Sequence, residues 1–399
     1  MGRITMKQRY DSYKPSGIDW IGDIPSHWNI VRLAHIFNAK AGGDAKPELY
    51  SDTKDAIHPF PVFTNSLLEN QVYAYTSSPT FQSGSITVTG RGEIGHAFLR
   101  DTDFDAIIRL LVLTPRIALC CKYFTYFIDG VMEFFSDSAA VSQLSAQQIN
   151  KEQVIIPPLA EQEAIAAWLD EKCGEIDAAI AKVDREIELI DELKQSEISR
   201  VVTRGLNPDA LLRPSGIDWI GDIPSHWKIN KLKYHAEIFS GEALSTKNLT
   251  EYSEIPVYGG GNILGYSKVA NTKCNTLITG RVGGDGTVRL IRKNFWATDN
   301  ALIIETDLEK TFLCNILNCA NLIRLNTSTA QPLLTATKIK NVEIPVPPLP
   351  EQQAIVDYLD KKCAEMDGLK AKLTKKRETL KELRQSIISE VVTGKRKII

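Results

Sequence analysis

The side chains that could catalyse a reaction are scattered along this chain instead of being gathered in motifs. Its six histidines are dispersed, and two of them, His27 and His226, hold matching places in a repeated segment. We expect residues matched in this way to have a structural or docking role instead of a catalytic one. No combination of residues predicts a nucleophile, a metal site or an acid–base pair. The pattern favours a binding protein over an enzyme.

Motifs for nucleotides and cofactors are also missing from the sequence. It has no G-x-x-x-x-G-K-[ST] segment, so we expect no ATP hydrolysis by this chain. The stretch YGGGNILGY at 258–266 does not follow a strand and open a helix in a βαβ unit, which argues against a dinucleotide site. The seven cysteines lack C-x-x-C spacing, so we expect reduced thiols without zinc or disulfides.

Composition is that of an ordinary globular chain. The 399 residues are 43% hydrophobic and 24% charged, which is compatible with two to four domains. No apolar run of about 18 residues predicts a membrane span. The first residues lack the apolar core of a signal peptide, so we expect a cytoplasmic protein. The net charge of −2 does not by itself indicate a polyanionic partner.

A long internal repeat organises the chain. The segment PSGIDWIGDIPSHW at 15–28 recurs letter for letter at 214–227. Further along, PPLAEQEAIAAWLDEKCGEID at 157–177 matches PPLPEQQAIVDYLDKKCAEMD at 347–367. The sequence therefore predicts two copies of one unit, related by a pseudo-twofold repeat.

Between these repeated frames, residues 31–154 and 230–344 share only short islands. One island is ITVTGRGEIG at 86–95, which matches LITGRVGGDG at 277–286. The repeated frames indicate that the same scaffold role is performed twice. The differing regions between them indicate that two different targets are recognised. Drift in the loops after a recent duplication is the alternative.

The charged segments that follow each P-P-L turn predict long helices. Proline blocks a helix before them, and apolar residues then recur at steps of three and four, as in a coiled coil. Each helix would have about 40 residues and a length of about 60 Å. Residues 160–204 hold 12 acidic and 6 basic side chains, whereas 350–394 hold 8 and 9. This difference favours pairing of the two helices with each other, with a coiled coil to another protein as the alternative.

The variable regions predict mixed, strand-rich domains. Short aliphatic runs at 86–89, 107–113 and 301–305 indicate strands, and 122–135 indicates a buried helix interrupted at Gly130, with 311–324 in the matching place. The fold class is therefore α+β, with two such domains joined by two long antiparallel coiled-coil helices. The predicted parts are a frame at 1–30, a domain at 31–156, a helix at 157–204, a frame at 205–229, a domain at 230–346, and a helix with a basic tail at 347–399.

The whole pattern resembles the DNA-specificity subunit of type I restriction–modification enzymes. The carriers of the resemblance are IPSHW before each variable region and P-P-L-x-E-Q-x-A-I after it, both present twice. The resemblance implies that each variable region is a target-recognition domain that reads one half of a split DNA site, and that the helices act as a spacer. It implies two methylating subunits and motor–nuclease subunits as partners. The chain itself would be non-catalytic and without a cofactor, because S-adenosylmethionine, ATP and Mg would bind those partners.

Within that resemblance, polar glycine-rich loops are the candidate DNA contacts, because backbone there can approach phosphate and a side chain can reach a base edge. The candidates are Thr89, Gly90 and Arg91, matched by Thr279, Gly280 and Arg281, and a second set of Thr64 and Asn65, matched by Gly260, Gly261 and Asn262. Tight turns that shape a sheet are the alternative for each glycine. Net charge is −3 over 31–154 and +3 over 230–344, so we expect the second domain to bind phosphate more strongly.

The repeated frames are candidate docking surfaces for two identical partners, because they offer two equivalent faces in one chain. The candidate docking residues are Trp20, His27, Trp28, Trp219, His226 and Trp227. A purely intramolecular packing role is the competing interpretation. At the level of function, the alternatives are an assembly scaffold or decoy that does not read DNA, and a nuclease with an unrecognised site.

Overall fold

The computed structural model describes residues 9–134, 143–282, 286–325 and 333–398. The chain divides into two compact units, of which one holds residues 1–184 and 375–399 and the other 185–374. The long helices α4 (Leu159–Arg204) and α7 (Leu349–Val392) each contribute one part to each unit. The two units are built alike, and each is described by itself.

The frame of the first unit joins the two ends of its variable region. β1 (Tyr13–Pro15) pairs with β2 (Asp23–Pro25), and β3 (Asn29–Arg32) pairs antiparallel with β12 (Gln153–Ile156). Because β12 ends directly before the proline turn, this pairing fixes where the variable region leaves and where α4 begins.

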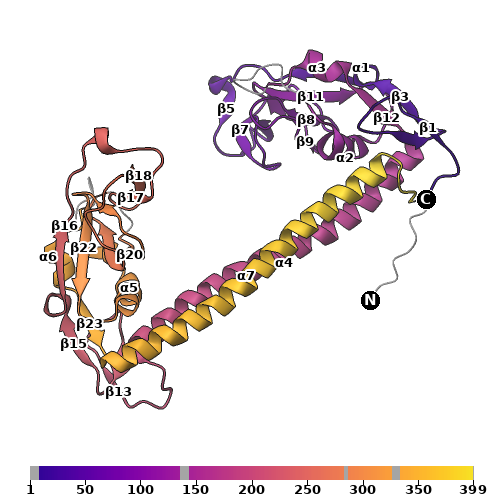
Figure 1. Cartoon of the computed structure of the whole chain (residues 1–399). Helices are drawn as coiled ribbons and strands as arrows, with labels where there is room; N and C mark the ends of the chain where they lie inside the picture. The colour runs from indigo at the N-terminus through magenta and orange to yellow at the C-terminus, as the bar shows by residue number, and fades with distance from the viewer. Residues whose placement is uncertain (1–8, 135–142, 283–285, 326–332, 399) are drawn as a thin grey trace. The chain divides into compact units, whose positions relative to one another are not determined.

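The variable region of the first unit contains two four-stranded sheets (Figure 1). The first has the order β4-β11-β8-β9, and α2 packs against it. The second has the order β10-β6-β7-β5 and is built around the β6–β7 hairpin. The bounds are β4 (Phe37–Ala41), β5 (Tyr50–Ser51), β6 (Phe60–Phe63), β7 (Val72–Thr76), β8 (Ile86–Thr89), β9 (Ala97–Leu99), β10 (Asp105–Ala106), β11 (Leu110–Pro115) and α2 (Cys121–Val131). Shorter elements are α1 (Leu33–Ile36), η1 (Pro47–Leu49) and α3 (Ala146–Lys151).

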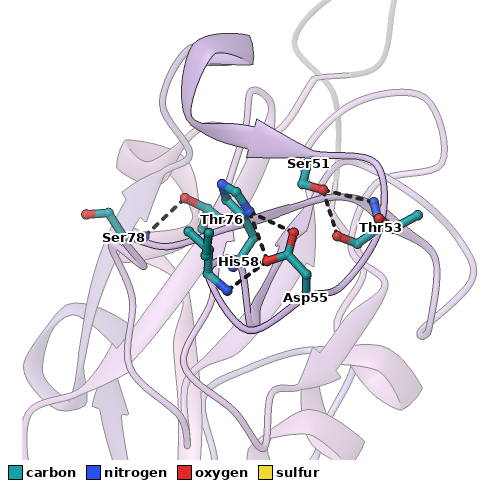
Figure 2. Close-up of polar contacts among 7 residues, drawn as sticks. Ser51, Thr53, Asp55, His58, Thr76 and Ser78 are labelled. Atoms are coloured by element: carbon teal, nitrogen blue, oxygen red, sulfur yellow. Dashed lines mark hydrogen bonds and ion pairs between the residues drawn. The ribbon is translucent and has the colours of Figure 1, made fainter.

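The loop between β5 and β6 is held by its own polar groups (Figure 2). The Asp55 carboxylate accepts the backbone N–H groups of Ile57 at 2.8 Å and His58 at 2.6 Å, and lies 3.1 Å from Nδ1 of the His58 ring. These hydrogen bonds, chiefly those from His58, lower the pKa of Asp55. The loop is therefore ordered by local contacts.

The second unit repeats this topology although its variable sequence differs, except that its second sheet has three strands instead of four. Its sheets have the orders β16-β22-β19-β20 and β18-β17-β21, and its frame pairs are β13–β14 and β15–β23. The bounds are β13 (Leu212–Pro214), β14 (Asp222–Pro224), β15 (Lys228–Lys231), η2 (Leu232–Tyr234), β16 (Ala236–Ser240), η3 (Thr246–Asn248), β17 (Ile255–Tyr258), β18 (Ile263–Ser267), β19 (Thr276–Gly280), β20 (Val288–Ile291), β21 (Trp296–Ala297), β22 (Ala301–Thr306), α5 (Lys310–Cys319), η4 (Leu322–Leu325), α6 (Ala336–Lys340) and β23 (Glu343–Val346). The duplication seen in the frames thus extends into the diverged regions.

The predicted antiparallel pairing of the long helices is confirmed within each unit. In the second unit, Lys370 contacts Asp191 at 2.7 Å and Lys194 contacts Asp367 at 2.7 Å, so position along α7 falls as position along α4 rises. In the first unit, Arg384 contacts Asp177 at 2.9 Å and Arg377 contacts Asp184 at 3.2 Å, which is the same antiparallel order. Each exposed ion pair contributes about 0–1 kcal/mol, so the buried apolar seam holds most of the pairing energy.

Two predicted elements differ from the structure. The helix expected at 122–135, with an interruption at Gly130, runs from Cys121 to Val131 and continues through Gly130. Glycine is needed at this position because a Cβ there would collide with the Ile388 side chain of α7. Residue 135 lies outside the described residues. The strand expected from residue 107 begins only at Leu110, because the N–H of Leu110 bonds the Ile107 carbonyl in a turn.

The described residues contain no helix that is both long and apolar enough to cross a lipid bilayer. All seven cysteines are free, and burial raises the pKa of the Cys314 thiol to about 11. Among the residues that the structure describes, no three His, Cys, Asp or Glu side chains are grouped so that they could hold a metal ion.

Candidate nucleic-acid interface

In the first unit, one amide side chain brings the two predicted loop sets together. Asn65 follows strand β6, and Gly90 and Arg91 follow strand β8. The Asn65 Oδ1 accepts the N–H groups of Gly90 at 2.7 Å and Arg91 at 3.2 Å, and its Nδ2 donates to the Arg91 carbonyl at 2.7 Å. Because three backbone groups are bonded to one side chain, the loop that carries Arg91 has a fixed conformation.

In the second unit the equivalent loops meet through their backbones. A Cβ on Gly280 would collide with the carbonyl of Gly260, and a Cβ on Gly260 would collide with the carbonyl of Val282. The Gly259 N–H also bonds the Asn262 carbonyl at 3.1 Å and closes the turn. Glycine is therefore required here for close approach, and the same loop contact is made without an asparagine side chain.

Arg91 and Arg281 are both exposed, and the backbone of each loop is held by a hydrogen bond to another segment of the same unit. The Gly90 carbonyl accepts the Leu144 N–H at 2.9 Å, and the Arg281 carbonyl accepts the Leu334 N–H at 2.9 Å. A long cationic side chain on a fixed backbone suits recognition of a phosphate or of a guanine edge.

Four of the candidate DNA contacts, namely two threonines and two glycines, are buried. Thr89 and Thr279 are 0% and 2% exposed, so their side chains cannot reach a base in this conformation. The Thr89 hydroxyl donates to the Glu93 carbonyl at 2.8 Å and accepts the His96 N–H at 3.0 Å. Gly90 and Gly280 are buried as well, and a Cβ on Gly90 would meet the Arg109 carbonyl. The close contacts at Gly90 and Gly280 fit the tight-turn alternative for the glycines, whereas the buried Thr279 hydroxyl has no hydrogen-bond partner among the described residues.

The candidates of the second loop set are at least partly exposed. Thr64, Asn65, Gly260 and Gly261 are half-buried, and Asn262 is exposed. All of them lie in the turns that contact the arginine loops.

Arg109, which lies directly before β11, was not among the residues predicted from the sequence. Its side chain is exposed, and its guanidinium donates to the Gln143 side chain. Its carbonyl faces Gly90, so Arg109 adjoins the Arg91 loop. Nothing in the local sequence pointed to it, since it is brought there by pairing of β11 with β8.

Arg100 is a buried cation that holds the β6–β7 loop. Its guanidinium carbon lies 3.7 Å from the centre of the Phe63 ring, Nε donates to the Thr87 hydroxyl at 2.9 Å and Nη1 donates to the Glu69 carbonyl at 2.5 Å. Burial lowers the pKa of Arg100 to about 10. The residue is therefore a structural support and not a phosphate ligand.

Four of the six candidate docking residues are engaged inside their own unit. Trp28 and Trp227 are 0% and 1% exposed, and each indole Nε1 donates to a glutamate of the P-P-L-x-E-Q motif at 2.9 Å. The acceptors are Glu161 and Glu351. The preceding residues His27 and His226 contact the same carboxylates at 2.6 and 2.8 Å. These contacts favour the intramolecular interpretation for Trp28 and Trp227, whereas the side chains of His27 and His226 are 48% and 53% exposed.

The remaining two candidates lie at the surface. Trp20 is 40% exposed, packs on Phe127 with ring centres 6.1 Å apart, and lines a pocket of about 520 Å³. Trp219 is half-buried and lines a pocket of about 250 Å³. These positions can contact a partner.

The glutamine of the same motif ties the variable region to the long helix. Gln162 Nε2 donates to the Pro157 carbonyl at 2.8 Å, and its Oε1 accepts the Cys120 N–H at 3.0 Å, next to the start of α2. Gln352 makes the equivalent bonds to Pro347 and Glu309, both at 2.9 Å. Both glutamines are 2% exposed, so these bonds are shielded from water.

A family model described as the type I restriction modification DNA specificity domain matches residues 25–188 and 224–376. The chain belongs to this family. The two matches cover both units, including each variable region and most of each long helix. The expectation of a specificity subunit instead of a catalytic one agrees with this family.

Individual relatives of the DNA specificity family agree with this assignment. A Mycoplasma pneumoniae protein described as a type I specificity subunit is 27% identical over 36% of this chain and 39% of its own length. The chain therefore spans about two fifths of that relative. The specificity subunit of the Escherichia coli type I restriction enzyme EcoDI is 19% identical over 94% of this chain and 89% of its own.

A solved structure shares the fold of this specificity-family chain. This structure is described as the structural basis of complex assembly and conformational transition of the type I R-M system. One of its chains superposes on this chain with a TM-score of 0.68. That match has 14% identity and covers 92% of this chain and 98% of the other.

Proposed function

We propose that this chain is the DNA-recognition subunit of a type I restriction–modification complex, with each variable region reading one half of a bipartite DNA site. The observation that carries the proposal is the pair of exposed arginines, Arg91 and Arg281, on equivalent anchored loops of two alike domains. The side chains around them differ between the domains, as two different DNA words require. The recognition domains of the proposal are residues 31–156 and 230–346.

The paired helices are proposed to fix the distance between the half-sites. α4 and α7 have 46 and 44 residues, which corresponds to about 69 and 66 Å. B-DNA repeats about every 34 Å, so two readers of one duplex need a spacing of that order. Rigid helices can set such a spacing, whereas a flexible linker cannot fix register.

The duplicated frames suggest which partners bind, because they offer two equivalent surfaces in one chain. Two methylating subunits would dock on the equivalent frames near Trp20 and Trp219, and motor–nuclease subunits would join for restriction. S-adenosylmethionine, ATP and Mg would bind to those partners, and this chain would be non-catalytic. Because the proposed ligand is double-stranded DNA inside the cell, the cytoplasm is the proposed site of action.

The proposal is tested by binding the complex of this chain and its methylating subunits to a library of random duplexes. A consensus of two short words with a fixed gap is the expected result. Binding without any enriched sequence would overturn the proposal in favour of a scaffold or decoy. Nicking of DNA by the purified chain alone with magnesium would instead support a nuclease.

A further inference from the structure

Both recognition domains carry a β-bulge at the same place in the hairpin of their second sheet. Pairing shifts between Val62 and Phe63 in the β6–β7 hairpin, and between Val257 and Tyr258 in the β17–β18 hairpin. The places are equivalent because the first strand of each hairpin also pairs in parallel with a two-residue strand, β10 or β21, at these same residues. The bulge is therefore a shared feature of two domains whose sequences have diverged.

Each bulge leaves one residue with a large side chain without a pairing partner on the opposite strand. In the first hairpin, Val62 pairs with Ala74 and Phe63 with Val72, so Tyr73 has no partner. In the second hairpin the same shift leaves out Leu264. Tyr73 is 52% exposed and Leu264 is 59% exposed. A bulge turns a side chain away from its regular direction, and bulges recur beside functional sites for this reason.

The hairpins that carry the bulges adjoin the arginine loops. In the first domain, the turn of the bulged hairpin holds Asn65, which is bonded to Gly90 and Arg91. In the second domain, the Leu264 side chain packs on Gly259, whose neighbour Gly260 touches Gly280. In each domain, the hairpin that carries the bulge is therefore the hairpin whose turn contacts the arginine loop. Tyr73 itself lies beside Tyr50 of β5, with ring centres 6.5 Å apart.

We propose that Tyr73 and Leu264 are specificity-determining contacts to base edges in the major groove of DNA. The inference rests on the proposed function and extends it to named positions. In the major groove, where the base edges can be reached by side chains, the apolar feature of a base edge is the methyl group of thymine. Leu264 offers only apolar contact and so reads a thymine, whereas Tyr73 adds a hydroxyl group and reads a different base edge. Because the two domains have different residues at this equivalent position, they would recognise different DNA sequences.

The test uses the full chain in complex with its methylating subunits, and a library of random duplexes. Leu264→Ala should reduce the preference for thymine about fourfold at one position of one half-site, the loss of one methyl contact. Replacing that thymine by uracil should cause the same loss with the unchanged chain and no further loss with Leu264→Ala. Tyr73→Ala should alter preference only in the other half-site.

Two exposed residues far from the hairpins in sequence serve as matched controls. Tyr234→Ala and Leu211→Ala, at positions 68% and 79% exposed, should leave both words unchanged. The inference is overturned if the Tyr73 and Leu264 variants keep the original words, or if uracil is accepted as well as thymine. Absence of any consensus with the unchanged chain would instead overturn the proposed function.

Discussion

The indole Nε1 of Trp28 donates a 2.9 Å hydrogen bond to the carboxylate of Glu161, which lies 133 residues further along the chain. Glu161 also accepts from the Tyr10 hydroxyl at 3.2 Å. The bond joins the repeated frame to the first turn of α4, and Trp227 and Glu351 repeat it in the second unit. It explains why tryptophan and glutamate recur together in both copies.

Replacing Glu161 by alanine should lower the free energy of unfolding by about 1–3 kcal/mol, because the buried indole N–H of Trp28 loses its acceptor. Urea denaturation of the two proteins measures the difference. Glu163→Ala is the matched control, since Glu163 is exposed two residues away and should change stability by at most about 0.5 kcal/mol. Equal effects of both substitutions would show that the bond does not stabilise the frame.

Replacing Asn65 by alanine should weaken recognition of one half-site about tenfold and leave the other unchanged. The loop that carries Arg91 loses three hydrogen bonds, so the arginine is no longer pre-positioned. Selection from random duplexes measures both half-sites in one experiment. Asn70→Ala, at an exposed position of the same loop, is the control and should retain both words. Loss of both half-sites would argue against separate readers.

Replacing Arg281 by alanine should reduce the slope of log affinity against log salt concentration by about 0.9, the value for one lost phosphate contact. Titrations of a labelled duplex at several salt concentrations give this slope. Lys233→Ala removes an exposed positive charge from the same unit and should leave the slope as it was. An unchanged slope for Arg281→Ala would mean that its guanidinium does not contact phosphate.

Lengthening both helices together should widen the gap between the half-sites. Repeating residues 184–190 in α4 and 371–377 in α7 adds one heptad to each and duplicates the contact between Asp184 and Arg377. Seven residues add about 10 Å, which equals about three base pairs. Mapping of methylated positions measures the gap. The same insertion in α4 alone breaks the register and should abolish bipartite recognition, and an unchanged gap in the double insertion would refute the spacer.

The features that could be predicted from the sequence are those that depend on interactions within a few residues. Proline turns and apolar steps of three and four predicted α4 and α7 closely, because these signals act within a few residues. The T-G-R loops were also found, since glycine and polar residues mark turns. The exposure of Arg91 and Arg281 agrees with this prediction.

The sequence by itself determined the duplication, the helices and the family. Tertiary structure alone decided which side chains are exposed, because burial depends on contacts between segments far apart in the chain. Trp28 and Trp20 lie in one repeated segment, yet only Trp20 faces solvent, since Glu161 and the end of α7 enclose Trp28. Likewise, only strand pairing could reveal that Tyr73 and Leu264 are equivalent, because their residue types have nothing in common.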